Sequence, residues 1–499
     1  MSIYTSITQL VNAAIKKQLI QREDEIYARN QVAAALHLQD FVEEPVTEEK
    51  SIPDLLEELT QYALDKGIID DLLDEKEIFG SNVMNIFISK PSEVNQTFYQ
   101  KYAQSPSLAT DYFYQLSQDS NYIQTKRIEK NISYQVETEF GELDITINLS
   151  KPEKDPKQIA LEKEKAKSNP SVGYPKCLLC VENEGYEGRI GHPARSNHRM
   201  IRMELTDEQW FLQYSPYVYY NEHCILLSGE HRDMKIDESA FRRLLTFVEK
   251  VPHYFVGSNA DLPIVGGSIL THDHYQGGNY EFAMAKAPEE FSFTLNGYAD
   301  VTGAIVKWPM SVIRLKGKEK ESLVEASTFI LDSWIKYQDE DVNIHSHTGQ
   351  TRHNTITPIA RQRDGVYEVD LVLRNNRTNA EHPLGIFHPH QDVQHIKKEN
   401  IGLIEVMGLA VLPARLKEEL LEVERYLLNE SNELAAYHKE WADQLRETYA
   451  STLSKRTVGE IVRKELGMKF LRVLQDAGVF KRDEKGQDGF KRFINSLNQ

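Results

Sequence analysis

The chain has 499 residues, a net charge of −18 and an isoelectric point near 5.4. Its length exceeds one simple core and predicts roughly two to four domains. The acidic balance argues against a nucleic-acid partner, which needs a basic face. Apolar runs are too short for a membrane span, and the start lacks a signal-peptide pattern, so we expect a cytoplasmic protein without membrane contact. Three cysteines argue against a disulfide framework and for reduced thiols.

The N-terminal region, residues 1–168, reads as helical and ends in a hairpin. Apolar residues at helical spacing form one stripe around Leu10 and another around Leu59. From Ile132 to Leu149 the period changes to alternation around Gly141, which is typical of a β-hairpin. The run from Lys151 to Ser168 is charged with almost no apolar face, and it predicts a solvated helix or linker.

Short alternating strands dominate residues 169–415. Examples are residues 201–205, 224–227 and 369–373. Helices are expected from an Asp237 N-cap and over residues 321–334. An order of strand, helix, strand and His-x-His occurs twice, which suggests a duplication with halves at 169–300 and 301–415. With a helical segment at 416–499, the sequence predicts an α/β (α+β) fold with a largely antiparallel sheet.

The segment His272-Asp273-His274-Tyr275-Gln276 carries the strongest chemical signal. On an extended strand, residues two apart point to the same side, so one imidazole can be anchored while the other is presented to a phosphate. The flanking pairs Gly266-Gly267 and Gly277-Gly278 permit close backbone approach to a ligand. Ser268 and Gln276 offer a hydroxyl and an amide for phosphoryl oxygens. The pattern suits His274 as a nucleophile; an isolated histidine would more often be a hydrogen-bonded core residue.

A CxxC motif at Cys177-Leu178-Leu179-Cys180 can direct two sulfurs at one tetrahedral ion. Two further ligands would have to come from elsewhere, and His231 and His272 are candidates. The alternative is a pair of small core residues with unrelated histidines. A redox dithiol is less favoured, because no thioredoxin-like order of elements follows.

These motifs together resemble a known family. The HxHxQ strand resembles the histidine-triad superfamily, and the whole chain is similar to the class II galactose-1-phosphate uridylyltransferases. The segments that carry this resemblance are Tyr174–Cys180, Asn183–Tyr186, Gly191–Arg195, Tyr217–His223 and Thr271–Gly278. The resemblance implies two histidine-triad-like halves and a possible homodimer.

The resemblance also implies an activity and a set of site residues. UMP would pass from UDP-glucose to galactose 1-phosphate by a ping-pong mechanism, which yields glucose 1-phosphate and UDP-galactose. His274 would be the uridylylated nucleophile, Gln276 would steady the nucleotidyl phosphate, and Asn259 and Ser268 would hold ribose or phosphate. The implied zinc ligands are Cys177, Cys180, His231 and His272.

Two other functions stay open at this point. One is a related nucleotidyl-histidine enzyme such as a dinucleoside polyphosphate phosphorylase, and the other is a non-catalytic, zinc-containing nucleotide-binding module. Gln276 favours transfer over hydrolysis, because hydrolytic relatives carry a third histidine there and an amide cannot ionise. His388 and His390 form a second His-x-His, either a second metal site with Glu281, Glu289 or Glu290, or histidines that support the sheet.

Overall fold

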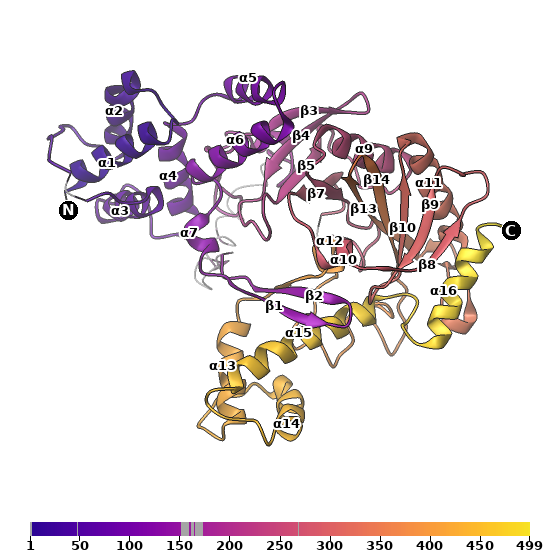
Figure 1. Ribbon diagram of the computed structural model, residues 1–499. Helices are drawn as coiled ribbons and strands as arrows, with labels where there is room; N and C mark the ends of the chain where they lie inside the picture. Colours follow the sequence, from indigo (N-terminus) through magenta and orange to yellow (C-terminus); the bar gives the residue numbers. More distant parts are fainter. Residues whose placement is uncertain (1, 47, 151–158, 161–163, 165–172, 268) are drawn as a thin grey trace. The chain divides into compact units, whose positions relative to one another are not determined.

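The structure is a computed structural model that describes residues 2–46, 48–150, 159–160, 164, 173–267 and 269–499 (Figure 1). It confirms a mixed α/β fold. The chain forms two compact units: the first comprises Met1–Lys130, Ser150–Val218 and Glu222–Arg232, and the second Asn131–Leu149, Tyr219–Asn221 and Asp233–Gln499. Most of the charged run 151–168 lies outside the described residues. The four-segment division therefore stays a prediction.

Helices dominate the first part of the first unit. They are α1 (Ile3–Lys16), α2 (Glu25–Ala35), α3 (Ile52–Asp65), α4 (Leu73–Asn85), α5 (Pro91–Tyr102), α6 (Pro106–Asp119) and α7 (Thr125–Ile128), with short 3₁₀ turns at Arg22–Asp24 and Val181–Asn183. Helices α1 and α3 pack together through the two apolar stripes, in which Leu10 and Leu59 are fully buried. The expected helical N-terminal region is confirmed.

The same unit contains three antiparallel strands. They are β3 (Ile201–Leu205), β4 (Glu208–Tyr214) and β5 (Cys224–Ser228), in the order β3-β4-β5. Strand β3 has the predicted bounds. Its residues 201, 203 and 205 are buried while 204 is exposed, as alternation requires.

The second unit is built on a larger antiparallel sheet with the order β7-β6-β13-β14-β10-β9-β8. Its strands are β6 (Phe255–Gly257), β7 (His274–Gly278), β8 (Glu289–Thr294), β9 (Thr302–Val306), β10 (Val312–Gly317), β13 (Asn354–Arg363) and β14 (Val366–Asn375). A short hairpin, β11 (His347–Thr348) with β12 (Thr351–Arg352), precedes β13. The expected largely antiparallel sheet is confirmed.

Two helices of this unit pack on the larger sheet. Helix α9 (Glu238–Lys250) contacts β6 and β13, and α11 (Lys320–Lys336) contacts β10, β13 and β14 (Figure 1). Asp237 caps α9 as predicted, because its carboxylate accepts from Ala240 N at 3.1 Å. Along the chain, β3-β4-β5-α9-β6-β7 and β8-β9-β10-α11-β13-β14 repeat one order of elements, which supports the duplication.

The remaining elements of the second unit surround a small sheet. The predicted hairpin is β1 (Ile132–Thr138) and β2 (Gly141–Ile147), and β15 (Leu409–Leu412) adds to β2 in parallel. The helices are α10 (Ala283–Lys286), α12 (Leu403–Val406), α13 (Leu416–Leu427), α14 (Lys439–Thr448), α15 (Val458–Ala477) and α16 (Glu484–Ser496), with 3₁₀ turns at Glu340–Val342 and Ala436–His438. Helices α13 to α16 confirm the expected helical segment at 416–499. The last of them, α16, buries Phe490 and Phe493.

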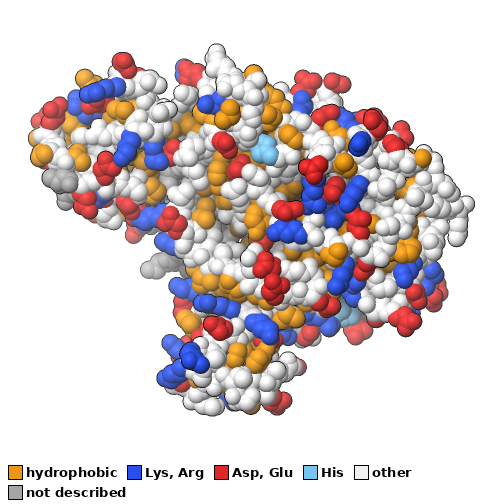
Figure 2. Space-filling model, in the orientation of Figure 1, with side chains coloured by type: hydrophobic (Ala, Val, Ile, Leu, Met, Phe, Trp, Pro, Cys, Tyr) orange, Lys and Arg blue, Asp and Glu red, His pale blue; other side chains and the backbone are white. Residues whose placement is uncertain are grey.

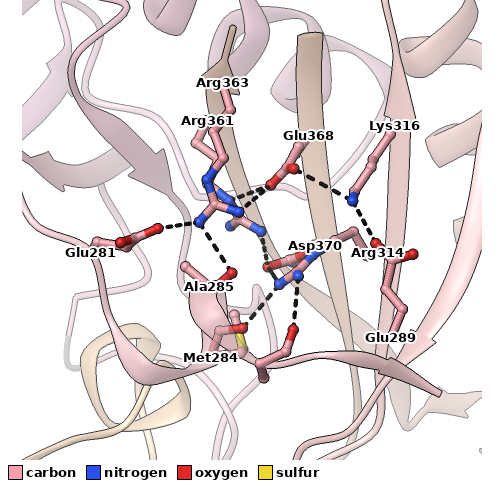
Figure 3. A network of polar contacts seen from close by, with 11 residues as sticks. Glu281, Met284, Ala285, Glu289, Arg314, Lys316, Arg361, Arg363, Glu368 and Asp370 are labelled. Atoms are coloured by element: carbon pink, nitrogen blue, oxygen red, sulfur yellow. Dashed lines mark hydrogen bonds and ion pairs between the residues drawn. The ribbon is translucent and has the colours of Figure 1, made fainter.

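A buried ion network joins the central strands of the larger sheet (Figure 3). Arg314 on β10 donates two hydrogen bonds to Asp370 on β14, at 2.7 and 3.0 Å. Arg361 on β13 donates to Asp370 at 2.7 Å and to Glu368 at 2.7 Å. Burial raises the pKa of Asp370, but Arg361 and Arg314 outweigh it and hold that pKa below its usual value. The carboxylate therefore stays charged in the core.

We expect Asp370→Asn to destabilise the second unit by about 3–5 kcal/mol, because the two arginines would keep buried charge without their shared counter-ion. Urea unfolding of the full chain measures this loss as a lower midpoint. Glu430→Gln, which breaks the surface pair of Glu430 with Lys455 at 2.8 Å, is the control and should cost less than about 1 kcal/mol. Equal losses in the two variants would contradict the assignment.

Acidic and basic side chains intermingle on the face seen in Figure 2. None of the described helices combines the length and apolarity that crossing a bilayer requires.

Candidate functional site

His274 is the first residue of β7, and strand geometry divides the motif between two sides. Within β7, His274 and Gln276 share one side and Tyr275 faces the other, while His272 lies in a bend before the strand. His272 and His274 are both buried, and Gln276 is half-buried. Strand β7 pairs with β6, with Gln276 opposite Gly257. A paired strand thus carries His274 and Gln276 as predicted, whereas His272, which was expected on the same strand, precedes it.

The imidazole of His274 has a defined hydrogen-bonding partner. Its Nδ1 lies 2.7 Å from the carbonyl oxygen of His272, so Nδ1 carries the hydrogen and donates it. Burial lowers the pKa of His274 to about 4, against the opposing effect of this hydrogen bond. At neutral pH the ring is therefore uncharged, with the lone pair on Nε2. This is the tautomer that a nitrogen nucleophile requires.

Arg243 on α9 holds the opposite side of β7. Its Nη1 lies 3.7 Å from Asp273 Oδ2 and donates to the hydroxyl of Tyr275 at 3.3 Å. The pattern alone left Asp273 and Tyr275 without a role; the structure makes them the tether of the strand to α9. The available signal was an arginine inside the buried stripe of α9, between Phe241 and Leu244.

Asn259 lies beside the glycine pair that precedes the motif. Its Oδ1 accepts from Leu403 N at 2.8 Å, at the start of α12. A Cβ on Gly267 would lie 2.7 Å from Asn259 Nδ2, and one on Gly266 would lie 2.5 Å from Ala260 O. The two glycines therefore also make room for the protein itself, and their approach to a ligand stays a prediction. Ser268 lies outside the described residues.

The first unit gathers three of the four expected metal ligands. The sulfurs of Cys177 and Cys180 are 3.4 Å apart, and Cys180 Sγ lies 3.1 Å from His231 Nδ1. Their donor atoms lie within 4.8 Å of one another. Two sulfurs on one tetrahedral zinc would be roughly 3.8 Å apart, so this set fits such an ion with small adjustments.

All three cysteines are thiols. Burial, helped by the side-chain hydrogen bond between Cys180 and Cys177, raises the pKa of the Cys180 thiol to about 12. A bound cation would displace that proton, because coordination deprotonates a thiol. The three donors of this cluster could hold a metal ion. His272, the fourth expected ligand, belongs to the second unit.

The second His-x-His, His388 and His390, is not presented from a strand as His274 is. His388 and His390 lie in a turn-rich segment after β14, not at the start of a strand. His388 Nδ1 lies 3.3 Å from Pro389 O, and His390 Nε2 lies 3.0 Å from Ile386 O. His390 also stacks on His382, with ring centroids 4.2 Å apart. These contacts are those of histidines that support the local backbone.

The three glutamates considered for a second metal site pair with arginine or lysine side chains instead. Glu281 accepts from Arg363 and Glu289 pairs with Lys316, both in the network of Figure 3, and Glu290 pairs with Arg482. Among the described residues, the Cys177 cluster is the only group of His, Cys, Asp or Glu donors close enough to share an ion. The idea of a second metal site is therefore not supported.

Fold and site define an α/β protein that presents an uncharged imidazole from an antiparallel sheet. Family models described as galactose-1-phosphate uridyl transferase, N-terminal and C-terminal domain, match residues 18–233 and 247–443. This chain belongs to the galactose-1-phosphate uridyl transferase family.

Full-length relatives agree with this assignment. Galactose-1-phosphate uridylyltransferase of Clostridium perfringens is 54% identical over 99% of this chain and 98% of its own. The protein of that name from Ligilactobacillus salivarius is 54% identical, over 96% and 97% of the two chains. The one from Streptococcus pneumoniae is 51% identical, over 99% of each.

We expect Gly267→Ala to destabilise the second unit by about 1–3 kcal/mol, because the added methyl group collides with the Asn259 amide. Thermal unfolding of the full chain measures this. Gly459→Ala on α15 is the matched control: its Cβ meets Glu424 Oε1 at 3.4 Å, an ordinary contact, and should not lower stability. If the Gly267→Ala chain is as stable as the control, the Asn259 side chain can move away from the added methyl group without loss of unfolding free energy, which would contradict the prediction.

Proposed function

We propose that the chain exchanges a uridylyl group between UDP-glucose and galactose 1-phosphate through a covalent intermediate on His274. The observation that carries the mechanism is the uncharged, buried imidazole with Nδ1 bound to the His272 carbonyl. Membership of the galactose-1-phosphate uridyl transferase family supports the substrates. The reaction places the chain in galactose metabolism as a nucleotidyltransferase.

In the first half-reaction, the Nε2 lone pair of His274 attacks the α-phosphorus of UDP-glucose. An N–P bond forms, and the bond from that phosphorus to the bridging oxygen breaks. The electron pair leaves with glucose 1-phosphate, a phosphate that needs no proton to depart. The ring gains positive charge as the N–P bond forms, and the hydrogen bond from Nδ1 to His272 O stabilises it.

The second half-reaction reverses these changes with another sugar phosphate. A phosphate oxygen of galactose 1-phosphate attacks the same phosphorus, and the N–P electron pair returns to Nε2. UDP-galactose leaves, and the imidazole regains its starting tautomer. Because no step requires a proton at residue 276, an amide there is sufficient.

We assign the neighbouring polar groups to the phosphate and the ribose. Gln276 extends from the same side of β7 as His274 and is half-buried, so its amide can donate to a phosphoryl oxygen. For Asn259 the group available to a ligand is Nδ2, because Oδ1 is bound to Leu403 N. Ser268 is carried over from the family resemblance alone.

Incubation with UDP-glucose alone should add one uridylyl group to the full chain, measured by intact mass. His274→Gln should accumulate less than about 10⁻³ of the wild-type adduct, because glutamine has no nucleophilic nitrogen. His347→Gln, at an exposed histidine, is the control and should react normally.

Diadenosine tetraphosphate in place of UDP-glucose tests the phosphorylase alternative. An adduct from it, but not from UDP-glucose, would favour that function. Failure of the active wild-type chain to form any adduct would rule out the covalent mechanism. UDP-glucose binding without adduct or exchange would favour a non-catalytic module.

We further propose that the Cys177 cluster binds one structural zinc ion, with His272 as the fourth ligand. Three thiol and imidazole donors already converge in the first unit, and a structural zinc site takes four. When bound, zinc would supply a fixed anchor for the segment that leads into His274. Zinc takes no part in the two half-reactions.

Elemental analysis of chelator-free protein should find about one zinc ion per chain. Cys177→Ser should lose most of it and unfold at a lower temperature, because the free energy of metal binding contributes to folding. Cys224→Ser changes the third cysteine, on β5, and should keep its zinc. Full zinc occupancy in Cys177→Ser would remove that residue from the ligand set.

The cellular compartment and the oligomeric state are inferred from the cysteines and from the family resemblance. Three thiols without a disulfide suit a reducing compartment, and we propose the cytoplasm. A homodimer stays an expectation from the family resemblance.

A further inference from the structure

Arg374, near the end of β14, is a buried cation that no step of the uridylyl transfer uses. It is 1% exposed, and none of the described carboxylates forms an ion pair with it. Its Nη1 donates to Thr357 Oγ1 at 3.1 Å, and its Nη2 donates to Ile401 O at 2.8 Å. Burial lowers the pKa of Arg374 to about 10, so the guanidinium stays charged at neutral pH. Because well-packed apolar side chains often stabilise a core at least as well as buried charges do, stability alone does not explain an arginine here.

Arg374 faces the same side of the larger sheet as the proposed nucleophile. In the register of the strands, Gln276 lies opposite Gly257, and Gly257 lies opposite Ile359. Ile359 lies opposite Asp370, and an even number of residues separates Asp370 from Arg374 on β14. Side chains directly opposite each other share a face of a sheet, as do residues two apart on one strand. Arg374 is therefore on the face at which β7 presents its imidazole and its amide.

A short segment, Ile401–Leu403, connects Arg374 to Asn259. Arg374 holds the carbonyl oxygen of its first residue, and the backbone N–H of its last residue donates to Asn259 Oδ1 at 2.8 Å. Between them, Gly402 N donates to Glu405 Oε2 at 3.2 Å. Because Oδ1 of Asn259 faces the segment, Nδ2 is the atom of this amide that can reach a ligand. The segment thus sets the orientation of Asn259.

Two glycines let this segment lie close to the strands. A Cβ on Gly257 would lie 2.8 Å from Leu403 Cδ1, so the leucine occupies the space of a side chain opposite Gln276. A Cβ on Gly402 would lie 3.1 Å from Asn259 Oδ1, which is tighter than an ordinary contact. The segment therefore has little room to shift without moving Asn259.

We propose that Arg374 is a positioning residue for the uridylyl transfer: it holds Ile401–Leu403, and this segment orients Asn259 toward the nucleotide. The inference rests on the proposed assignment of Asn259 to ribose or phosphate. An arginine suits this task, because its planar guanidinium donates from two nitrogens in fixed directions and so binds the strand and the segment together. Arg374 is buried and acts through Asn259, without contact to the substrate.

Calorimetric titration of the full chain with UMP tests this proposal, because UMP has the ribose and the phosphate but no sugar phosphate to release. Asn259→Ala should bind UMP about 10-fold more weakly. Arg374→Met keeps a long side chain without its donors and should weaken binding by about the same factor. The double variant should bind within about twofold of Asn259→Ala, because both residues act through one contact. Arg492→Met, which removes a surface arginine held by Asp339, is the control and should bind as the wild type does.

Gly402→Ala is a second variant, which leaves Arg374 in place and crowds Asn259 Oδ1. It should bind UMP about 3-fold or more weakly, and this loss should vanish when residue 259 is already alanine. Gly459→Ala is its matched control, because the added Cβ meets only an ordinary contact of 3.4 Å. Thermal unfolding shows which variants are folded, and the Gly402→Ala comparison decides the question if Arg374→Met is not.

Losses that add in the double variants, to about 100-fold for Arg374→Met with Asn259→Ala, would overturn the proposal. Wild-type affinity in a folded Arg374→Met chain, or in Gly402→Ala, would also overturn it. Wild-type affinity in Asn259→Ala would remove the assignment of Asn259 and this inference with it. Adduct formation on His274 is measured separately, so the covalent transfer can stand when this inference fails.

Discussion

The arrangement of the second unit depends on one buried carboxylate, Asp370, shared by Arg314 and Arg361. A charge in the core is tolerated only when its partners are in place, so the register of β10, β13 and β14 is specified by electrostatics as well as by apolar packing. Strand β13 pairs with β6, and β6 pairs with β7, which begins at His274. The position of His274, the proposed nucleophile, therefore depends on strand pairing that the ion pairs of Asp370 stabilise.

The geometry of β7 directs neighbouring side chains to different partners. On one side of β7, His274 offers Nε2 while its Nδ1 is bound to the backbone of His272. On the other side, Asp273 and Tyr275 are held by Arg243 of α9. Burial keeps the imidazole of His274 uncharged. An uncharged imidazole is the form that can attack phosphorus. His274 and Gln276, which we propose for the chemistry, thus alternate with Tyr275, which supports the strand.

For the binding of small anions, the charge that lines a cavity matters more than the net charge of the chain. The acidic balance argues against a nucleic-acid partner, yet one cavity of the first unit is lined by more cationic than acidic side chains, Arg195 and Lys130 among them. An anionic substrate meets the groups that line its site and not the average of the chain, and salt screens the distant carboxylates. The −18 charge therefore predicts which macromolecules are avoided but not which small anions are bound.

The sequence by itself predicted the antiparallel sheet, the N-cap of α9, the bounds of β3 and the proximity of the CxxC sulfurs, because each depends on local periodicity or on fixed short spacing. Only the tertiary structure decided that Gly267 makes room for Asn259, that Glu281 and Glu289 pair with Arg363 and Lys316, and that Arg243 tethers β7. These facts join residues far apart in the chain. A one-dimensional pattern states which groups are available, but burial and the pairing of charges depend on which distant groups the fold brings within hydrogen-bond distance.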